Sequence, residues 1–337
     1  MSLVPFLHRV SSGESLSSAE AYEAMNVLLE GNASEPAMAG FLVALRMKGE
    51  TASELAGFAR AMREKAVFID AGPDVIDIVG TGGDGAGTFN ISTVAAIVMA
   101  GAGARVAKHG NRAISGRVGS ADMFEALGVR IAMTPEEAVH AVREIGLGFL
   151  FAPHLHPAMK YAQAVRRELK MRTVFNLLGP LANPARAQMQ VIGAPSPEAA
   201  KIMADALSEL GTRHSFVVHG HDGLDEVSTT SSTDIYEVCG GRVEKHIWAP
   251  EDFGVPRTTR ERLAGGSAAD NARITRAILG GESGARRDIV LVNAAAGLLA
   301  GGLAQDPREG VAKAAESIDC GSAGAVLDKL QNKFPAF

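Results

Sequence analysis

The chain has 337 residues, a length typical of roughly two domains, and its 47% apolar and 21% charged residues are those of a globular protein with a large core. A net charge of −5 argues against nucleic acid as the main partner, since wrapping nucleic acid needs a basic surface. Two distant cysteines, Cys239 and Cys320, indicate a reducing compartment without a disulfide framework. No apolar run approaches the roughly 18 residues of a membrane span, and residues 1–18 lack a signal-peptide pattern, so we expect a cytoplasmic protein.

The first 70 residues predict helices only. Three helix starts precede apolar residues at helical spacing: the capping-box pairs Ser17 with Glu20 and Thr51 with Glu54, and Ser34 followed by Pro36. The second of these helices should end near Gly49, and Gly72-Pro73 marks a break in the pattern. Residues 1–72 are therefore predicted to form a small helical domain.

From residue 73 onward, strand-like and helix-like segments alternate. The predicted strands are 75–79, 105–108, 149–152, 190–192 and 216–219, and the helices between them include 92–101, 121–127 and 135–145. Such alternation favours a mostly parallel sheet with helices on both faces. Segments 235–238 and 243–247 flank Gly240-Gly241 and predict a hairpin. The last third is helical, with 289–300 as a buried core helix.

The segment DIVGTGGDGAGTFNIST, residues 77–93, is a glycine-rich loop between a strand and a helix. Glycines let backbone N–H groups approach an anion, and the helix start after Asn90 attracts phosphate. Gly80, Gly82 and Gly85 formally match the dinucleotide pattern. However, the next strand ends in Lys108 where a dinucleotide fold wants an acid, and Asp84 would repel bare pyrophosphate. A plain strand-to-helix turn remains the alternative.

Two basic stretches follow the strand ends. The first, RVAKHGNRAISGR, contains Arg105, Lys108, His109, Arg112 and Arg117, and no acid occurs from residue 101 to 120. It predicts a second wall of a phosphate site, with a solvated basic loop as the alternative. The second lies within residues 160–185, where Arg166 and Lys170 should share one helical face and Arg166 could hold a carboxylate.

An acidic loop, HGHDGLDEVS, follows the last parallel strand. It contains Asp222, Asp225 and Glu226, and adjacent carboxylates suit Mg²⁺ beside substrate phosphates. His219 and His221 would suit a transition metal instead, but no cysteine accompanies them. We interpret both histidines, and His154 and His156 further upstream, as surface loop residues, with a role in the site wall left open for the latter pair.

Seven segments together, GTGGDG, NIST, KHGNR, GSAD, HPAMK, RTVFNLLGPLANPA and DGLDE, resemble the anthranilate phosphoribosyltransferases of the nucleoside phosphorylase/phosphoribosyltransferase superfamily. Their order and spacing extend the resemblance over essentially the whole chain. The resemblance implies a cytoplasmic homodimer. Each subunit would have a small N-terminal helical domain, joined by helices from about 160–185, and a large α/β domain over 73–337 with a mostly parallel sheet flanked by helices. It also implies transfer of phosphoribose from phosphoribosyl pyrophosphate (PRPP) to the amine of anthranilate in tryptophan biosynthesis, with two Mg²⁺ ions.

The resemblance also implies site residues. The positions that match PRPP contacts are Gly80, Gly83, Asp84, Thr88, Asn90, Ile91, Ser92, Thr93, Lys108, His109, Gly110, Asn111, Arg112, Ala113, Ile114, Ser115, Gly116 and Ser120. Those that match anthranilate contacts are Gly80, Asn111 and Arg166, and those that match metal ligands are Ser92, Asp225 and Glu226. The chain departs from the family at Gly116 and Val118, where Ser is frequent, at Ala164, where Pro is common, and at Lys170, where Gly is frequent.

No residue is assigned as a general acid or base, because an aromatic amine is already neutral at pH 7. We interpret His109 as a hydrogen-bond donor lining the pocket. Three rival functions remain for comparison: a pyrimidine nucleoside phosphorylase, a nucleic-acid-binding relative without transferase activity, and an NAD dehydrogenase. The pair Asp225–Glu226 and the segment KHGNR argue against the first, the negative charge against the second and Lys108 against the third.

Overall fold

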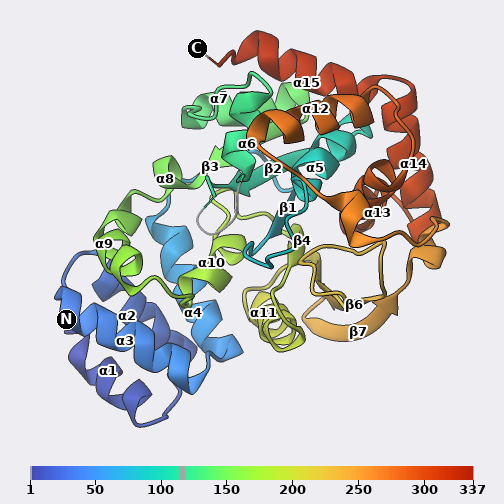
Figure 1. The fold of residues 1–337 in the computed structure, drawn as a ribbon. Helices are drawn as coiled ribbons and strands as arrows, with labels where there is room; N and C mark the ends of the chain where they lie inside the picture. Colours follow the sequence, from blue (N-terminus) through green and yellow to red (C-terminus); the bar gives the residue numbers. More distant parts are fainter. Residues whose placement is uncertain (1, 114–117, 337) are drawn as a thin grey trace.

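One seven-stranded sheet organises the computed structural model, which describes residues 2–113 and 118–336 (Figure 1). Its strands lie in the order β3-β2-β1-β4-β5-β6-β7. Their bounds are β1 (Val75–Gly80), β2 (Arg105–Gly110), β3 (Leu147–Phe151), β4 (Met189–Gly193), β5 (His214–Gly220), β6 (Thr233–Cys239) and β7 (Arg242–Trp248). The first five run parallel, and β6 and β7 are antiparallel to their neighbours. The mostly parallel sheet is confirmed.

The strand ends agree with the sequence to within two or three residues. β3 ends at Phe151 rather than 152, because Ala152 begins the short helix α8 (Ala152–Leu155). The hairpin turns at Gly240 and Gly241, whose φ angles of 56° and 77° lie in the left-handed region that glycine adopts without strain.

Alternate residues of each strand face two different cores. In β5, Phe216 and Val218 pack in one core while Val217 packs in the other. The first core lies under α5 (Ile91–Gly101), α6 (Ser120–Ala126), α12 (Ala268–Leu279), α13 (Ala285–Ala300), α14 (Pro307–Asp319) and α15 (Ser322–Lys333), with α7 (Pro135–His140) and the π-helical turn Ala141–Ile145 at its edge (Figure 1). The predicted buried helix 289–300 is part of α13 and is confirmed.

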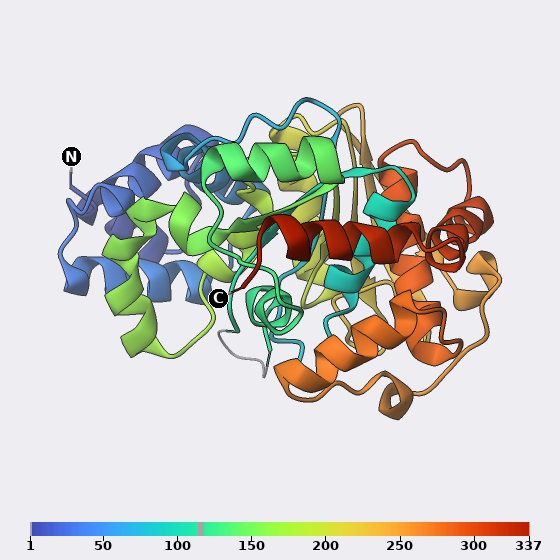
Figure 2. The ribbon, with the colours of Figure 1, turned by 90° about the horizontal axis from the view of Figure 1, so that it is seen from above.

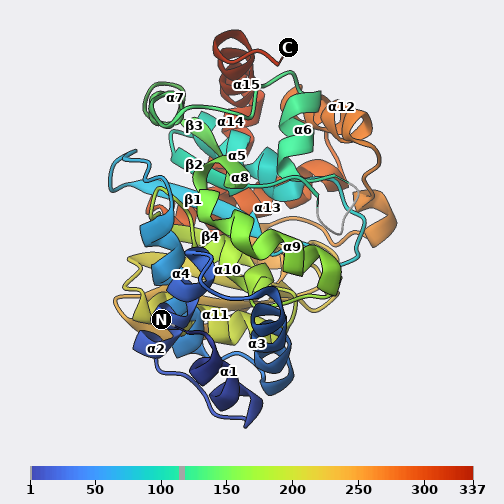
Figure 3. The same ribbon diagram turned by 90° about the vertical axis from the view of Figure 1, so that its left-hand side faces the viewer.

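The second core joins the sheet to the N-terminal helices. It is formed by α1 (Val4–Ser11), α2 (Ser18–Leu29), α3 (Glu35–Lys48) and α4 (Ala52–Lys65) together with α9 (Lys160–Leu169), α10 (Phe175–Leu181) and α11 (Pro197–Glu209). α9 packs on α2 and α3, and α10 on α4, so later helices complete the N-terminal group (Figure 3). Figure 2 shows this group at one end of the molecule and α14 at the other, with α15 across the middle.

Both predicted capping boxes are present. The Ser17 hydroxyl accepts the N–H of Glu20, the Thr51 hydroxyl accepts the N–H of Glu54, and the Ser34 hydroxyl accepts the N–H of Ala37. In the described ranges, no helix has the length and apolar character that a membrane span requires.

Glu54 is also the polar centre of the N-terminal helices. Its side chain is fully buried; Oε1 accepts the N–H of Leu16 at 2.9 Å, and Oε2 accepts the ammonium of Lys48 at 3.0 Å and the N–H of Thr51 at 2.8 Å. The Thr51 hydroxyl also donates to Oε2 at 3.0 Å, so four donors depend on one carboxylate.

We expect Glu54→Ala to lower the free energy of unfolding by about 3 kcal/mol, because it leaves two N–H groups without an acceptor and removes the charged partner of Lys48, whose ammonium keeps only the carbonyl of Gly49 and the hydroxyl of Ser15. Urea unfolding followed by circular dichroism measures the change. The matched control is Asp205→Ala, which breaks the exposed pair with Lys201 on α11 and should change stability by about 0.5 kcal/mol or less. Equal effects of the two substitutions would contradict the assignment.

Candidate active site

The candidate site lies where the order of the strands reverses. Successive strands from β1 to β3 add on one side of β1, and β4 and β5 add on the other, so the chain leaves the neighbouring strands β1 and β4 for helices on opposite faces of the sheet, α5 and α11. Ligands of open α/β sheets bind at such a point. The N–H of Thr81 donates to the carbonyl of Gly193 at 2.9 Å and holds the two strand ends together.

Two glycines let the acidic loop approach these strand ends. A Cβ placed on Gly193 would lie 1.6 Å from the carbonyl oxygen of Asp225, and one on Gly80 would lie 2.5 Å from its Oδ2. Any larger residue would push the loop away. The N–H of Gly82 donates to the same Asp225 Oδ2 at 2.7 Å, which links the glycine loop to the acidic loop.

A side chain from the segment between α9 and α10 contacts the glycine loop. Gly82 and Gly83 have φ angles of 69° and 73°, and Arg172 donates to their carbonyls at 2.8 Å and 3.0 Å. Asp84 Oδ1 accepts the N–H of Ala86 at 3.0 Å within the loop. The sequence does not predict this contact, because nothing local pairs Arg172 with a loop 89 residues away.

Asp225 and Glu226 form a crowded pair of carboxylates. Burial, reinforced by the charge of Asp84, raises the pKa of Asp225 to about 6. Burial and the charge of Asp225 raise the pKa of Glu226 to about 8, although Lys108 opposes this. Groups whose ionised forms are disfavoured in this way are common at functional sites and would gain from a cation. Their oxygens, with the hydroxyl of Ser92, are the hard ligands that Mg²⁺ prefers.

In residues 2–113 and 118–336, no three His, Cys, Asp or Glu side chains form a group that could hold a metal ion. The alternative of a transition metal on the histidine pair finds no support, because His219 Nδ1 contacts the carbonyl of Ala194 at 2.9 Å and His221 Nε2 contacts Asp234 at 3.0 Å.

Lys108 brings a positive charge to the same place. The side chain is 1% exposed, and its ammonium donates to the carbonyl of Ile78 at 2.6 Å and to Ser92 Oγ at 3.4 Å. Burial lowers the pKa of Lys108, and the charges of Asp77 and Glu226 oppose this. The N–H of Ser92 donates to Glu226 Oε1 at 3.1 Å, so the start of α5 connects the lysine to the acidic pair.

His109 points to the opposite side of β2. Its Nδ1 lies 3.1 Å from the carbonyl of Gly179 in α10, and its ring centroid lies 5.1 Å from that of His156. Burial lowers the pKa of His109 to about 3 and that of His156 to about 4. The Nε2 atom of each ring has no hydrogen-bond partner among the described residues.

The prediction that the histidines lie on the surface is therefore wrong for two of them. His156 is 6% exposed and His219 is 7% exposed, whereas His154 and His221 are exposed. His156 follows the short helix α8 after β3 and packs against His109 of β2, a distant contact that a local sequence pattern does not reveal.

Arg166 lies in α9 and packs against α10. Its guanidinium carbon lies 4.9 Å from the ring centroid of Phe175, and burial lowers its pKa. Among the described residues, no hydrogen bond or ion pair occupies this guanidinium. The expectation that Lys170 shares its helical face is wrong, because α9 ends at Leu169 and Lys170 adopts φ 48°, a conformation that explains why the family often has Gly there.

The described residues on either side of the gap at 114–117, between β2 and α6, contact one another. The Ser120 hydroxyl donates to the carbonyl of Asn111 at 3.4 Å, and the same hydroxyl would lie 2.2 Å from a Cβ on Gly110. Arg112 is paired with Glu125 at 2.6 and 2.7 Å and with Asp122 at 3.0 Å. Ala113 donates its N–H to Asp122. Three predicted PRPP contacts, Ile114, Ser115 and Gly116, lie outside the described residues.

The remaining predicted contacts frame the start of α5. Thr88 forms a bridge with Ala264, and the side chain of Asn90 contacts Val118 and Asn271. The side chains of Ile91 and Thr93 are buried under the helix, so only their backbone can face a ligand.

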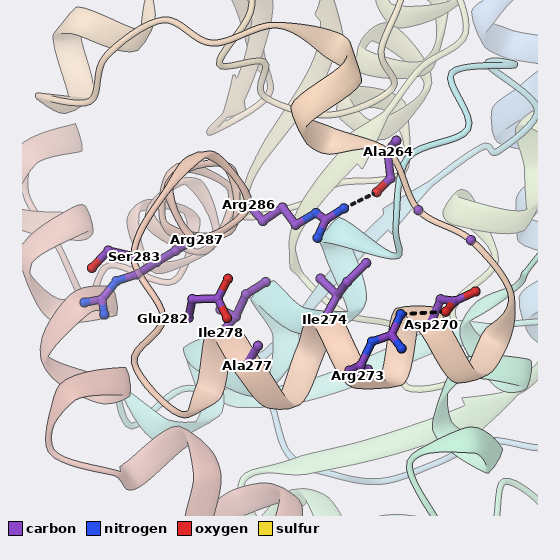
Figure 4. Close-up of a pocket in the computed structure, with 12 residues that line it drawn as sticks. Ala264, Asp270, Arg273, Ile274, Ala277, Ile278, Glu282, Ser283, Arg286 and Arg287 are labelled. Atoms are coloured by element: carbon purple, nitrogen blue, oxygen red, sulfur yellow. Dashed lines mark hydrogen bonds and ion pairs between the residues drawn. The ribbon is translucent and has the colours of Figure 1, made fainter.

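A separate hollow of about 340 Å³ lies between α12 and the start of α13 (Figure 4). Arg286 reaches the carbonyl of Ala264 there, and Arg273 pairs with Asp270 (Figure 4). It contains none of the predicted site residues.

Comparison with known proteins gives two family matches. The a/b domain of a glycosyl transferase family matches residues 72–324, and the helical bundle domain of a glycosyl transferase family matches residues 4–66. Over 98% of both chains, the protein is 54% identical to an anthranilate phosphoribosyltransferase of Solibacter usitatus. It is 50% identical to that of Symbiobacterium thermophilum over 96% of both.

Solved structures agree. The anthranilate phosphoribosyltransferase of Thermus thermophilus is 45% identical, with a TM-score of 0.91 over 97% of this chain and 98% of that chain. The Saccharomyces cerevisiae enzyme in complex with PRPP and Mg is 30% identical, with a TM-score of 0.89 over 98% and 97%. A complex of the yeast enzyme with 4-fluoroanthranilate is 29% identical, with a TM-score of 0.88 over 98% and 96%.

We expect His156→Gln to make the free energy of unfolding depend less on pH below neutrality. The folded pKa of about 4 lies below the ordinary 6.5, so the unfolded chain takes up the proton first as the pH falls. The stability contribution is thus present above pH 6.5 and is lost as the pH falls towards 4, by about 2 kcal/mol between pH 7 and pH 5. Urea unfolding at the two pH values measures it. A wild type and variant that lose the same stability would contradict a buried neutral His156.

Proposed function

This chain belongs to the anthranilate phosphoribosyltransferases of the glycosyl transferase family, and from that premise we propose that it transfers the phosphoribosyl group of PRPP to the amine of anthranilate and releases pyrophosphate. The reaction is a step of tryptophan biosynthesis. The observation that carries the proposal is the meeting of Lys108, Ser92 and the pair Asp225–Glu226 at the point where the strand order reverses.

Mg²⁺ fits this group of residues. Asp225 and Glu226 are carboxylates whose pKa values burial raises, and a divalent cation would compensate the charge that they carry when ionised. We propose that these two residues and Ser92 hold two ions. When bound, Mg²⁺ supplies positive charge that polarises the phosphate oxygens of the substrate.

The residues around the glycine loop bind the leaving pyrophosphate. Breaking the bond between ribose C1 and pyrophosphate leaves positive charge on the sugar and negative charge on the departing group, so fixed positive groups around the latter stabilise the transition state. Lys108 supplies a buried ammonium, and the loop from Gly80 to Thr88 supplies backbone N–H groups. Arg172 binds the carbonyls of Gly82 and Gly83 in this loop. The amides at the start of α5 point to the same place.

The acceptor side is built from β2, α9 and α10. We propose that Arg166 holds the carboxylate of anthranilate, since a guanidinium pairs with a carboxylate through two hydrogen bonds. Asn111 and the neutral ring of His109 would orient the aromatic amine. Because that amine is neutral near pH 7, its lone pair is available without a general base, and the site contributes mainly by holding the two substrates in line.

The remaining PRPP contacts, including Arg112 and Ser120, are proposed on the family pattern alone. Arg112 would have to leave Glu125 and Asp122 in order to bind phosphate. We also propose a homodimer and a cytoplasmic location, which size-exclusion chromatography with light scattering and cell fractionation test.

A direct assay tests the function. Purified protein with PRPP, Mg²⁺ and anthranilate should consume the fluorescence of anthranilate, and EDTA should stop the reaction. Fluorescence that persists at saturating substrate would refute the transferase. Phosphorolysis of thymidine or uridine in a parallel assay would instead indicate a nucleoside phosphorylase, and salt-dependent retention on DNA would indicate a nucleic-acid-binding protein.

We expect Arg166→Ala to raise the KM for anthranilate by roughly 10- to 100-fold and to leave the KM for PRPP within about twofold, because a charge-assisted hydrogen bond contributes about 1.5–3 kcal/mol. Arg167→Ala is the matched control, since this neighbour is exposed on the same helix. Steady-state kinetics with each substrate varied in turn give both constants. An unchanged anthranilate KM, or an equal effect of the control, would remove Arg166 from the acceptor site.

A further inference from the structure

A buried carboxylate accepts hydrogen bonds where the backbone pairing of β1 with β2 stops. The ladder between these strands contains only Val75 opposite Arg105 and Ile76 opposite Val106. β1 continues to Gly80 in register with β4, and β2 continues to Gly110 in register with β3, so the sheet opens between the two after Ile76. Beyond that point, side chains replace backbone partners across the gap.

Asp77 is the first of these side chains. It is completely buried; Oδ1 accepts the backbone N–H of His109 at 3.1 Å, and Oδ2 accepts Asn183 Nδ2 at 2.7 Å. Asn183, also completely buried, donates through the same nitrogen to the carbonyl of Ala107 at 2.9 Å and accepts the N–H of Ala185 at 2.8 Å. We call Asp77 and Asn183 the bracket.

The bracket forms hydrogen bonds with β2 on both sides of Lys108. Its two contacts to that strand are the carbonyl of Ala107 and the N–H of His109, the neighbours of the lysine in the chain. Since consecutive strand residues point to opposite faces, one rigid segment directs Lys108 towards Ser92 and His109 towards Gly179.

We propose that Asp77 and Asn183 are positioning residues for phosphoribosyl transfer: their hydrogen bonds replace the missing pairing of β1 with β2 and fix Lys108 against the PRPP side and His109 against the anthranilate side. The inference rests on the proposed function, because it assigns the two sides of β2 to the two substrates. It adds to that function two residues that touch neither substrate.

The direction of every hydrogen bond in the bracket is fixed by backbone groups. Two N–H groups and one carbonyl face it from the chain, so Asp77 has to accept twice and Asn183 has to donate through its nitrogen. Burial raises the pKa of Asp77 to about 6, and Lys108 and the bracket's own hydrogen bonds oppose this, so the carboxylate is ionised at pH 8. Asp77→Asn keeps the size of the side chain but places an NH₂ group against a donor.

Exchange of the two residues separates positioning from bulk stability. In the double variant Asp77→Asn with Asn183→Asp, position 77 accepts the N–H of His109 and donates to position 183, which accepts the N–H of Ala185. The carboxylate oxygen at position 183 then faces the carbonyl of Ala107, acceptor against acceptor, so this one contact becomes unfavourable and recovery is partial. A role in positioning therefore predicts that the exchange restores much of what Asp77→Asn removes.

Ser215→Ala is the matched control. Ser215 is completely buried, and its hydroxyl accepts the backbone N–H of Gln190 at 3.1 Å, again joining neighbouring parallel strands through a side chain. It lies near the amino ends of β4 and β5, whereas the candidate site lies at the carboxyl ends of the strands. The control should lower the melting temperature and leave kcat and both KM values within about twofold.

We expect Asp77→Asn at pH 8 to lower kcat with both substrates saturating by about tenfold or more, since a small misplacement of reacting groups reduces rates steeply. The variant should remain folded by circular dichroism, and hydrogen exchange of the His109 amide should accelerate. The double variant should recover at least about half of the loss on a logarithmic scale, together with the protection of His109.

Three outcomes would overturn the inference: an Asp77→Asn variant with the kinetics of Ser215→Ala, a kcat loss that the exchange of residues does not recover, or unchanged protection of the His109 amide. A wild-type protein without transferase activity would refute the proposed function, and with it the catalytic role of the bracket. An active wild type beside an unaffected Asp77→Asn would refute the bracket alone.

Discussion

The reversal of strand order at β1 is the constraint on which the rest of the site depends. It sends the chain from β1 and from β4 to opposite faces of the sheet, and on the other side of β1 the pairing with β2 covers only two positions. The first effect opens a crevice that Gly80 and Gly193 keep free for the acidic loop. The second exposes backbone groups inside the protein, which Asp77, Asn183 and Lys108 satisfy with side chains. Two charged residues, Asp77 and Lys108, thus also join β1 to β2 where the backbone pairing is missing.

Burial gives these charges their chemical character. In water, Lys108 and the pair Asp225–Glu226 would be strongly hydrated and would contribute little to one another; out of water, each depends on the others and on what binds between them. The raised pKa values of the two acids and the lowered pKa of the lysine mean that burial disfavours the charged form of all three side chains. A substrate that brings pyrophosphate together with Mg²⁺ would supply a cation for the carboxylates and an anion for the lysine, and would so stabilise their charged forms.

The sequence predicted the fold well because its local signals agree with the tertiary structure. The capping boxes at Ser17 and Thr51, the turn Gly240-Gly241 and the alternation of strands and helices all depend on neighbours in the chain. The family motifs located the glycine and acidic loops. What the sequence missed depends on distant partners: Arg172 on the glycine loop, Asn183 on Asp77 and the burial of His156. No spacing rule connects residues 89 or 106 positions apart. Lys170 was misplaced for a local reason, a left-handed residue at a helix end that is not glycine.

The central claim is that one cation-dependent phosphate site joins the glycine loop, Lys108 and the Asp225–Glu226 pair. Its most direct test is a crystal structure with PRPP and Mn²⁺ in place of Mg²⁺, in which anomalous scattering locates the metal. The account predicts a manganese peak bound to oxygens of Asp225 or Glu226 and to the pyrophosphate, with the glycine loop against the phosphates. Manganese and pyrophosphate bound elsewhere, with this pair of carboxylates free of metal, would contradict it.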